Sequence, residues 1–424
     1  MADTKKPLGT YHLRKICRFC GSHRLAMVLD LGRFPLAGGF LKPERFTQEK
    51  FYPLTLAMCE VCSLVQVREE VDASTLFKNY FYFSSSIKTL VAHCADFAQE
   101  VTDRFLRSTG SPSVLEIGCN DGVMLRPFAQ LGVKTVGIDP AVNVVASIQD
   151  KDFDVINDFF NERSAVKIAQ QYRGFDAIVS SYSFAHIDDM IGVIKGVKRL
   201  LKPQGVFVFE VYYLGTLLDE MQYDMIYHEH LSYYSLKSLA HFLGSHDMEI
   251  FEVKFTPGVR SGAVRFYARH KNKRTDPIDG SVVKLAQQEK DRGYNGINAL
   301  AAYGQNVVRA RERLLALLDQ IKRQGKTIIG YGASGRGTII MNYCGIDGRY
   351  LDYVVDDAPA KHGFYTPGTH VIIHPWEHAR EKRPDYALLF AWSFINEVRQ
   401  RRQDYLQAGG QFIVPLPEVS VVGL

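Results

Sequence analysis

The sequence predicts an α/β protein in three parts, with a small metal-binding domain over residues 1–70 and two Rossmann-like domains over residues 71–280 and 281–424. Three observations support this prediction. The chain has 424 residues, about three times the length of a common domain. Two CxxC pairs stand near the N-terminus. Further on, two strand-like runs each end in a glycine turn that leads into a helical segment, as in parallel α/β folds.

Composition and charge restrict the class of protein. Hydrophobic residues make up 46% of the chain and charged residues 23%, the balance of an ordinary globular protein. Fifty-one basic residues against 46 acidic ones leave a formal charge of +5 with no basic block, so we expect no nucleic-acid partner. The N-terminus lacks an apolar signal segment, and Glu210 interrupts the most apolar stretch. We therefore expect a cytoplasmic protein without a membrane partner, as a monomer or a small homo-oligomer.

The cysteines of residues 1–70 predict a metal site. Cys17-Arg-Phe-Cys20 and Cys59-Glu-Val-Cys62 are two CxxC turns, each of which can direct two thiolates at one tetrahedral ion. Four thiolates leave no open position for a substrate, so the pattern predicts a structural Zn²⁺ rather than a catalytic one. Two buried turns with free thiols, or a redox CxxC, are the alternatives.

From residue 113 onward, short apolar runs alternate with helical patterns. An aromatic and hydroxyl cluster at 77–86 and a helix-like stretch at 87–107 come before them, and a helical period covers 282–324 and ends at Gly325. Strands are expected at 114–118, 133–139, 175–181, 205–211, 327–332, 351–357, 386–392 and 409–417.

The first glycine turn favours S-adenosylmethionine as its ligand. The run from Val114 to Gly122 is a buried strand, a turn containing Gly118, and the start of a helix, which lets backbone amides approach a nucleotide-type ligand. Asn120 replaces the second glycine of a dinucleotide site. Glu116 at the strand end would repel a pyrophosphate but attract a sulfonium or amino group.

Two further segments are expected beside the same ligand. Asp139 ends the next strand, where a carboxylate can accept hydrogen bonds from ribose hydroxyls. Asp158 and Phe159, in the run 157–160, are expected to face the adenine. The alternative for the acidic residues is a solvated strand end or a helix cap.

A cluster of titratable side chains follows the fourth strand. Tyr227-His228-Glu229-His230 places two imidazoles, a carboxylate and a phenol together. Methylation of an unactivated carbon requires a base beside an adjacent carbonyl, and histidine titrates near the working pH. A phenol can stabilise the developing enolate oxygen. The alternatives are two core histidines around an ion-paired acid, or a metal site, although the HExxH spacing is missing.

Together these motifs identify a family resemblance that covers nearly the whole chain. The two CxxC pairs, Leu115-Glu-Ile-Gly-Cys-Asn-Asp-Gly122, Ala185-His186-Ile-Asp188, Ile226-Tyr-His-Glu-His-Leu-Ser-Tyr233 and Gly330-Tyr-Gly-Ala-Ser-Gly-Arg-Gly337 resemble the nucleotide-sugar C-methyltransferases of deoxysugar biosynthesis. The resemblance implies a zinc domain, a methyltransferase domain and a C-terminal Rossmann-like domain. The implied reaction is methylation at C-3 of a 4-keto-6-deoxy sugar linked to a nucleoside diphosphate of the dTDP or GDP type.

The resemblance also assigns roles to individual residues. It implies that His230 is the base, that Tyr227 lies near the keto or enolate oxygen, and that Glu229 and His228 orient or assist. The aromatic cluster matches the family segment that covers the cofactor, which makes Tyr82 and the hydroxyls from Ser84 to Ser86 candidate contacts, with an aromatic wall of the core as the alternative.

This chain departs from the family pattern at two places. Ser181-Tyr182 stands where the family commonly has asparagines, which affects a polar contact near the cofactor or sugar. Arg260-Ser-Gly-Ala-Val-Arg265 stands where many members read His-Gly-Gly-Ser-Leu-Arg. Arg260 is a candidate to pair with a diphosphate or a sugar substituent, or it lies in solvent.

The second glycine turn has two interpretations. Thr327 to Gly335 is a strand with a true GxGxxG, and Asp356 ends the next strand, a pattern typical of NAD binding. The same turn can hold any diphosphate, and the resemblance implies the nucleotide sugar. Ser334 and Arg336 are then candidate phosphate contacts, beside Asp356 and Lys361, with helix capping and surface charge as alternatives.

Two other functions remain open from the sequence. An NAD-dependent oxidoreductase would use the C-terminal GxGxxG. A zinc-ribbon nucleic-acid methyltransferase would use the CxxC turns. Binding along a phosphate backbone needs a cluster of basic residues, however, and the near-neutral charge balance of this sequence argues against one.

Overall fold

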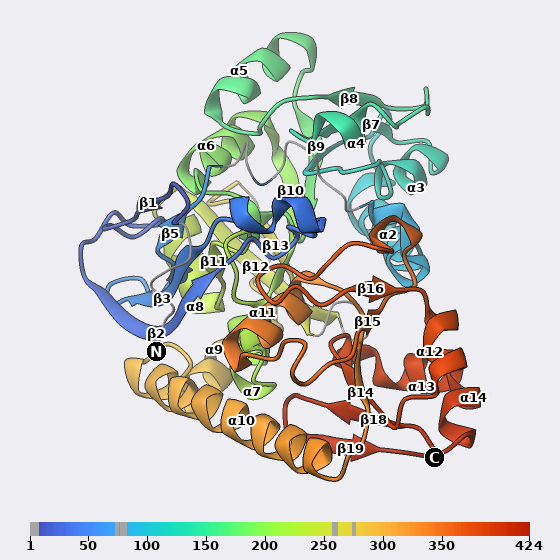
Figure 1. Cartoon of the computed structure of the whole chain (residues 1–424). Coiled ribbons are helices and arrows are strands. Elements are labelled where there is room, and N and C mark those ends of the chain that lie inside the picture. The colour runs from blue at the N-terminus through green and yellow to red at the C-terminus, as the bar shows by residue number, and fades with distance from the viewer. Residues whose placement is uncertain (1–7, 73–75, 77–82, 257–261, 274–276) are drawn as a thin grey trace.

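The N-terminal part of the protein consists mainly of antiparallel strands. The computed structural model describes residues 8–72, 76, 83–256, 262–273 and 277–424 (Figure 1). A four-stranded sheet has the order β11-β4-β3-β2, and β1 pairs with β5 in a separate ribbon. One strand of this sheet, β11, comes from far along the chain, directly after His230. The elements are β1 (His12–Leu13), β2 (Leu25–Phe34), η1 (Pro43–Gln48), β3 (Tyr52–Cys59), β4 (Val65–Val67), β5 (Glu69–Glu70) and β11 (Ser232–Tyr233).

The central sheet has seven strands in the order β12-β13-β10-β9-β6-β7-β8, and only β13 runs antiparallel to its neighbours. Alternate side chains of each strand point to opposite faces. Val114 and Val208 therefore pack with α2 and α3, whereas Leu115 and Phe209 pack with α5, α6 and α8. The strands are β6 (Ser113–Ile117), β7 (Lys134–Ile138), β8 (Asp154–Ile156), β9 (Phe175–Ser181), β10 (Leu201–Tyr212), β12 (Met248–Thr256) and β13 (Ala263–His270).

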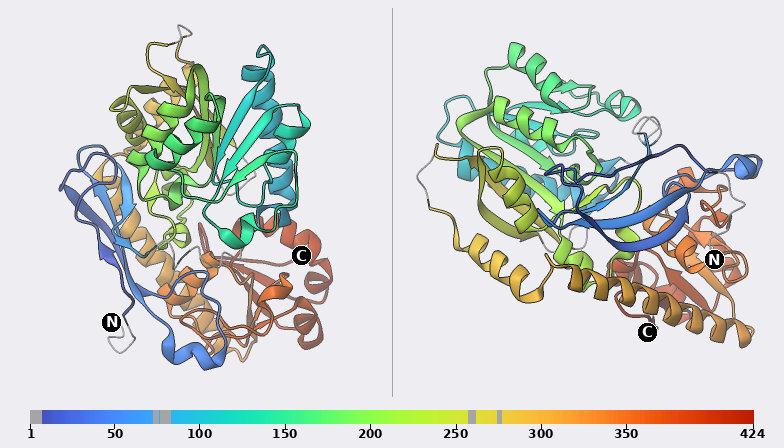
Figure 2. Two further views of the ribbon diagram at one scale, coloured as in Figure 1. Left: turned by 90° about the horizontal axis from the view of Figure 1, so that it is seen from above. Right: turned by 90° about the vertical axis from the view of Figure 1, so that its left-hand side faces the viewer.

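Helices cover both faces of this sheet, which is the layer arrangement of a doubly wound α/β domain (Figure 2). A π-helical turn, η3 (Thr102–Leu106), extends α2. The other elements of this part are η2 (Ser84–Ser86), α2 (Lys88–Val101), α3 (Leu125–Gln130), α4 (Val142–Val145), α5 (Glu162–Gln171), η4 (Phe184–His186), α6 (Met190–Leu200), α7 (Leu214–Asp219), η5 (Tyr223–Met225), α8 (Leu236–Gly244) and α9 (Gly280–Arg292).

A second, six-stranded sheet lies in the C-terminal part, with the order β16-β15-β14-β17-β18-β19. All pairs are parallel except β18 with β19. Its elements are β14 (Ile328–Tyr331), α11 (Gly335–Cys344), β15 (Val354–Val355), η6 (Pro359–Lys361), β16 (Ile373–His374), α12 (Trp376–Lys382), β17 (Tyr386–Leu389), η7 (Trp392–Phe394), α13 (Ile395–Arg401), α14 (Gln403–Gln407), β18 (Gln411–Val414) and β19 (Ser420–Val422).

The helical period over 282–324 proves to be two helices rather than one. Helix α9 ends at Gly293, whose φ of 67° is left-handed, and α10 (Ile297–Arg323) begins after Gly296. Glycine favours this conformation at a helix end, so the Gly-Tyr-Asn-Gly run separates the helices. Figure 2 shows α10 running along one side of the molecule, past β2 of the N-terminal sheet and the C-terminal domain.

One hydrophobic core joins the first and last parts of the chain. Buried residues such as Leu56 of β3, Leu300 of α10 and Ile328 of β14 belong to the same cluster. The predicted α/β architecture with a cysteine-bearing N-terminal domain and two Rossmann-like domains is therefore confirmed, whereas the boundaries at residues 70 and 280 stay a prediction. Among the helices of the described residues, none combines the length and apolar character needed to cross a membrane.

Candidate functional site

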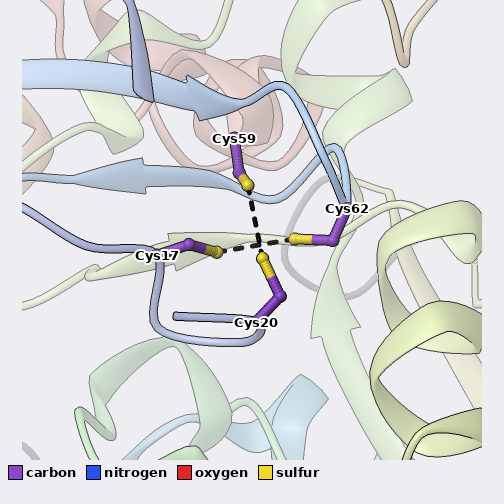
Figure 3. A group of neighbouring side chains, drawn as sticks. All are labelled: Cys17, Cys20, Cys59 and Cys62. Carbon is purple, nitrogen blue, oxygen red and sulfur yellow. Dashed lines mark hydrogen bonds between the residues drawn. The ribbon is translucent and has the colours of Figure 1, made fainter. Parts of the chain in front are cut away.

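The four cysteines of the two CxxC turns converge on one point (Figure 3). The Sγ atoms of Cys17 and Cys62 are 3.4 Å apart, those of Cys20 and Cys59 are 3.5 Å apart, and all four lie within 4.8 Å of one another. Four sulfurs bound to a tetrahedral zinc at about 2.3 Å would be separated by about 3.8 Å. The donor set therefore fits a closed, structural zinc site.

The two CxxC turns have the same backbone geometry. The amide N–H of Gly21 donates to the carbonyl of Cys17, and the N–H of Ser63 donates to the carbonyl of Cys59, at 3.0 and 2.9 Å. Gly21 and Ser63 both have a left-handed φ, 68° and 63°. This turn folds each pair of thiols to one side, which places both pairs on one ion.

The first glycine turn lies at the carboxyl edge of the central sheet, between β7 and β9, where the direction of the strand order reverses. Ligands of open α/β sheets bind at this switch point. Gly118 has a φ of 76°, and a Cβ at this position would lie 2.1 Å from the Oγ of Ser183. Only glycine therefore permits this close approach of the turn to the segment after β9.

A buried, unneutralised set of carboxylates surrounds the turn. Glu116 is 3% exposed and its Oε2 has no hydrogen-bond partner in the described part of the chain, and the same holds for Oδ1 of Asp121. Burial, with the charges of Asp139 and Asp121, holds the pKa of Glu116 well above its ordinary value. A cationic ligand would satisfy these oxygens, which is the fit expected for a sulfonium or ammonium group.

The other predicted cofactor residues take different positions around the turn. Asp139 accepts hydrogen bonds from the amides of Asn120 and Ala141, both at 2.9 Å, and burial raises its pKa. The amide of Ser84 donates to Oδ1 of Asn120, so η2 lies on the turn. A cavity of about 30 Å³ between them is lined by Ser84, Glu116, Gly118 and Asn120.

Asp158 and Phe159 lie further out, after β8. Phe159 is 48% exposed, and Asp158 accepts from Lys167 at 3.4 Å. The turn thus groups Ser84, Glu116, Gly118, Asn120 and Asp139, whereas Asp158 and Phe159 are not among the residues that line its cavity. Tyr82 and Arg260 fall outside the described residues.

His230 forms the centre of the candidate catalytic cluster. Its Nδ1 lies 2.8 Å from the carbonyl oxygen of Met225, and its Nε2 lies 2.8 Å from the hydroxyl of Tyr227. A carbonyl only accepts hydrogen bonds, so Nδ1 carries the proton and the neutral ring has its basic lone pair on Nε2. The phenol and the basic nitrogen therefore face each other.

The remaining residues of the Tyr-His-Glu-His run point in different directions. His228 is buried with Nε2 2.9 Å from the carbonyl oxygen of Pro53 in β3, and burial lowers its pKa to about 4. It connects the run to the N-terminal sheet and does not join His230. Glu229 makes no hydrogen bond within the described part of the chain, and burial raises its pKa to about 7.

The cluster faces a junction of the three parts of the chain. A Cβ on Gly38 would lie 3.8 Å from Oε1 of Glu229, and a Cβ on Gly335, in the first turn of α11, would lie 4.0 Å from the ring of Tyr227. The N-terminal loop, the histidine run and the second glycine turn therefore meet at one place.

Three further aromatic residues lie beside His230 or the first glycine turn. The ring centroid of His186 lies 5.0 Å from that of His230, and the ring of Tyr212 lies 5.1 Å from it. Tyr182 lines the cavity at the glycine turn and packs against Tyr212 at 5.2 Å, so it connects the two sites. The position of Tyr212 at the carboxyl end of β10 is the signal that could have identified it.

The residues near the second glycine turn that were predicted to bind the substrate already make contacts within the protein. Ser334 caps α11 by accepting from the amide of Gly337. Arg336 donates to the buried carboxylate of Asp224 at 2.7 Å, and its Nη2 has no partner among the described residues. Lys361 donates to Oδ2 of Asp356 at 3.2 Å and to the carbonyl of Ala333 in the glycine turn at 2.7 Å.

A larger cavity lies elsewhere. About 720 Å³ in volume, it lies between α8, α9 and β12 and is lined mainly by apolar residues such as Ala240, Ile250 and Val282. It does not border the glycine turns or the histidine cluster, so its size does not make it the site of the chemistry.

Comparison with solved structures finds methyltransferases that match part of the chain. The glycopeptide N-methyltransferase MtfA, complexed with S-adenosylmethionine, is 14% identical with a TM-score of 0.33, covering 42% of this chain and 87% of that chain. Magnesium protoporphyrin IX methyltransferase from Synechocystis PCC 6803 is 13% identical with a TM-score of 0.35, covering 47% of this chain and 98% of that chain.

A curated relative matches this chain over its full length. C-methyltransferase NovU from Streptomyces niveus is 31% identical over 423 residues, 100% of this chain and 99% of that protein. A mitochondrial ubiquinone biosynthesis O-methyltransferase from Bos taurus is 29% identical over 119 residues, 25% of this chain and 32% of that protein. The second similarity is therefore confined to a segment.

Three family models match consecutive parts of the chain. A zinc binding domain matches residues 17–77, a methyltransferase domain matches residues 91–253, and a C-methyltransferase C-terminal domain matches residues 258–417. The predicted zinc and S-adenosylmethionine are the metal and cofactor of this arrangement. With the full-length similarity to NovU, these matches show that the chain belongs to the S-adenosylmethionine-dependent C-methyltransferases with an N-terminal zinc-binding domain.

Proposed function

We propose that the protein methylates C-3 of a nucleoside-diphosphate-linked 4-keto-6-deoxy sugar of the dTDP or GDP type. The observation that carries this proposal is the His230–Tyr227 pair, in which the carbonyl of Met225 leaves the basic nitrogen of His230 facing a phenol. C-methylation of a ketone needs a base for the adjacent C–H and a donor for the enolate oxygen. The pair supplies both groups.

The proposed sequence of events uses these two side chains. Nε2 of His230 takes the C-3 proton, and the C–H electrons form an enolate whose oxygen accepts a hydrogen bond from the Tyr227 phenol. Bound S-adenosylmethionine would supply the electrophilic methyl group for the enolate carbon, and its neutral thioether product would need no acid. Glu229 would assist this pair, and His228 would orient the run through its contact with the carbonyl of Pro53.

The first glycine turn is proposed to hold the methyl donor. Glu116 would face the sulfonium or amino group, because its buried carboxylate has an oxygen without a partner in the described chain. Asp139 would accept from the ribose, and Gly118, Asn120 and Ser84 would shape the pocket. Asp158, Phe159 and Tyr82 complete the proposed cofactor residues.

The second glycine turn is proposed to hold the diphosphate of the nucleotide sugar. The turn precedes α11, whose N-terminal amides favour an anion. Nη2 of Arg336 and the Lys361 ammonium, together with Ser334, are the proposed phosphate contacts, and Asp356 would bind a sugar hydroxyl. Arg260 stays a candidate for the same substrate. This turn lies against Tyr227, so one ligand can reach both places.

Solvent exchange and methyl transfer together test the proposal. A dTDP-4-keto-6-deoxy sugar is incubated with the protein in deuterium oxide, with and without S-adenosylmethionine. We expect deuterium at C-3 and transfer of a methyl group, both lost in His230→Asn and retained in the matched control His241→Asn, which changes an exposed histidine of α8. Exchange and transfer at wild-type rates in His230→Asn would show that the base is another residue.

Ligand binding tests the alternative use of the C-terminal GxGxxG. Calorimetric titration should show tighter binding of S-adenosylmethionine than of NAD, and the opposite order would favour an oxidoreductase. A thermal-shift series of dTDP-, UDP-, GDP- and CDP-sugars with S-adenosylhomocysteine identifies the nucleotide, because a ligand that binds the folded state raises its apparent stability.

A further inference from the structure

The first CxxC turn carries two residues that reach beyond the zinc site. We propose that Arg18, between Cys17 and Cys20, is a positioning residue for methyl transfer: it holds Asp188 and thereby sets the His186 segment against His230. The effect on methylation rests on the proposed function, whereas the effect on the two imidazoles does not. The zinc would then determine the position of a catalytic segment as well as the fold of the N-terminal part.

Arg18 is a buried cation with an unusual set of contacts. Its side chain is 0% exposed. Nη1 donates to the carbonyl of Val67 at 2.6 Å and to Gln66 at 3.2 Å, and Nη2 donates to Glu70 at 3.0 Å. These partners belong to the N-terminal part. The remaining bond, from Nε to Oδ1 of Asp188 at 3.0 Å, extends to the methyltransferase domain.

Asp188 ends the segment that carries His186, and its Oδ1 also accepts from Nη1 of Arg14 at 2.6 Å. On the other side of this segment, the amide of Leu231 donates to the carbonyl of Ala185 at 2.6 Å, and the hydroxyl of Tyr234 donates to the carbonyl of Phe184 at 2.8 Å. The segment is therefore held between the strand after His230 and the first zinc turn. Its His186 ring lies 5.0 Å from His230.

Phe19 of the same turn packs against α8 and lies near Tyr234. Its ring stacks on Phe242 of α8, with centroids 4.0 Å apart and planes at 11°, and lies 5.9 Å from the ring of Tyr234. Arg18 and Phe19 thus reach both segments that border His230. The four thiols hold this turn against the second CxxC turn, so a bound zinc would fix the backbone position of Arg18.

Stability alone is a weak reason for this arrangement. A buried ion pair often contributes no more than an apolar replacement of the same size, because both charges lose their hydration. What a guanidinium adds is direction, since each N–H must point at its own acceptor. An arginine whose bonds join two domains beside a catalytic histidine is therefore best explained by the geometry that it imposes.

The experiment compares three substitutions. Asp188→Asn removes the charge of the acceptor while keeping its shape, and Asp188 is 48% exposed, so folding should tolerate the change. Arg18→Met removes every side-chain donor of Arg18 and leaves the bond from Arg14 to Asp188 in place. Glu60→Gln is the matched control, because Glu60 has the same place in the second CxxC turn but pairs only with the exposed Arg24 among the described residues. Each variant is measured for zinc per chain, kcat and KM with a dTDP-4-keto-6-deoxy sugar, and imidazole NMR signals after ¹⁵N-histidine labelling.

We expect Asp188→Asn and Arg18→Met to lower kcat by about tenfold or more, because small displacements at a reacting centre are costly, while KM stays within about threefold. One zinc per chain should remain in Asp188→Asn. The loss of kcat in the double variant should be smaller than the two single losses combined, because both changes weaken the bond from Arg18 to Asp188, whereas only Asp188→Asn affects the bond from Arg14. Glu60→Gln should keep the wild-type kcat.

Two results would overturn the proposal. One is a wild-type kcat with unchanged His186 and His230 signals in Asp188→Asn, and the other is an equal loss of kcat in Glu60→Gln. The imidazole signals need no substrate, so they decide the matter even when none of the proteins methylates the sugar. A shift of both signals in zinc-loaded Asp188→Asn supports the positioning role, and unchanged signals contradict it.

Discussion

At the scale of single residues, one backbone carbonyl determines the chemistry of the candidate base. A histidine of a Tyr-His-Glu-His run can serve as a base, a cation or a structural donor, and the pattern of residues does not separate these roles. Met225 accepts the Nδ1 proton of His230, whereas Pro53 binds His228 on the other side of the run. The two histidines therefore have different hydrogen-bond partners, which is why we propose different roles for them.

Glu229 gives a prediction about stability and pH. Burial raises its pKa from 4.5 to about 7. Between these values the folded protein retains a proton that the unfolded chain has released, so stability falls as the pH rises and the whole loss is present above pH 7. Glu229→Gln should therefore leave stability nearly unchanged near pH 4.5 and increase it by roughly 3 kcal/mol at pH 8.

Urea unfolding at both pH values measures this difference. The exposed Glu418 provides the matched control, since Glu418→Gln should have the same small effect at each pH. Equal stability of wild type and Glu229→Gln at pH 8 would mean that the carboxyl is well solvated in the folded state. A gain in stability together with a loss of methylation would support a role of Glu229 at the site.

At the scale of elements, some features of the fold follow from residues that are close together in the sequence, and others depend on residues far apart. The spacing of two thiols within each turn is local, and the prediction of zinc needed nothing more. The break between α9 and α10 was also visible as a Gly-Tyr-Asn-Gly run, but the helical period continued across it and concealed it. The pairing of β11 with β4 was not predictable, because two-residue strands carry no periodic signal.

Removal of zinc should destabilise more than the N-terminal part. Cys17, Cys59 and Cys62 belong to the same core as Phe242 of α8 and Phe209 of β10. A structural zinc contributes folding free energy directly, so Cys62→Ser should lower the melting temperature by on the order of 10 °C. Differential scanning calorimetry of zinc-loaded and chelator-treated protein measures the effect.

Adding zinc back is the control for this prediction. It should restore the melting temperature of the chelated wild type and should not restore that of Cys62→Ser. An unchanged melting temperature after complete removal of zinc would show that packing alone holds the two turns together.

At the scale of the whole molecule, the three parts share contacts that no single part contains. Asp224 of η5 is fully buried and accepts from Arg336 of α11 and from the indole of Trp392, at 2.7 and 2.8 Å. This interaction joins the histidine run to the C-terminal domain. It also explains why Arg336 is only partly available to a phosphate.

Breaking this interaction should destabilise the protein strongly. Arg336→Met leaves the Asp224 carboxylate without its cation, which costs roughly 3 kcal/mol for a buried pair. Asp224→Asn in the same chain should recover part of the loss, because it removes the uncompensated charge. Urea unfolding of the single and double variants measures both effects, and additive losses would show that the two side chains act independently.

The sequence by itself determined the layer architecture, the zinc ligands and the residues of the first glycine turn. These features depend on spacing, period and turn chemistry, which neighbouring residues express directly. Tertiary structure alone decided the tautomer of His230, the separate hydrogen-bond partner of His228, the pairing of Arg336 with Asp224 and the bond from Arg18 to Asp188. Each of these depends on which partner folding brings within hydrogen-bond distance of a side chain, and that partner is absent from the local pattern of residues.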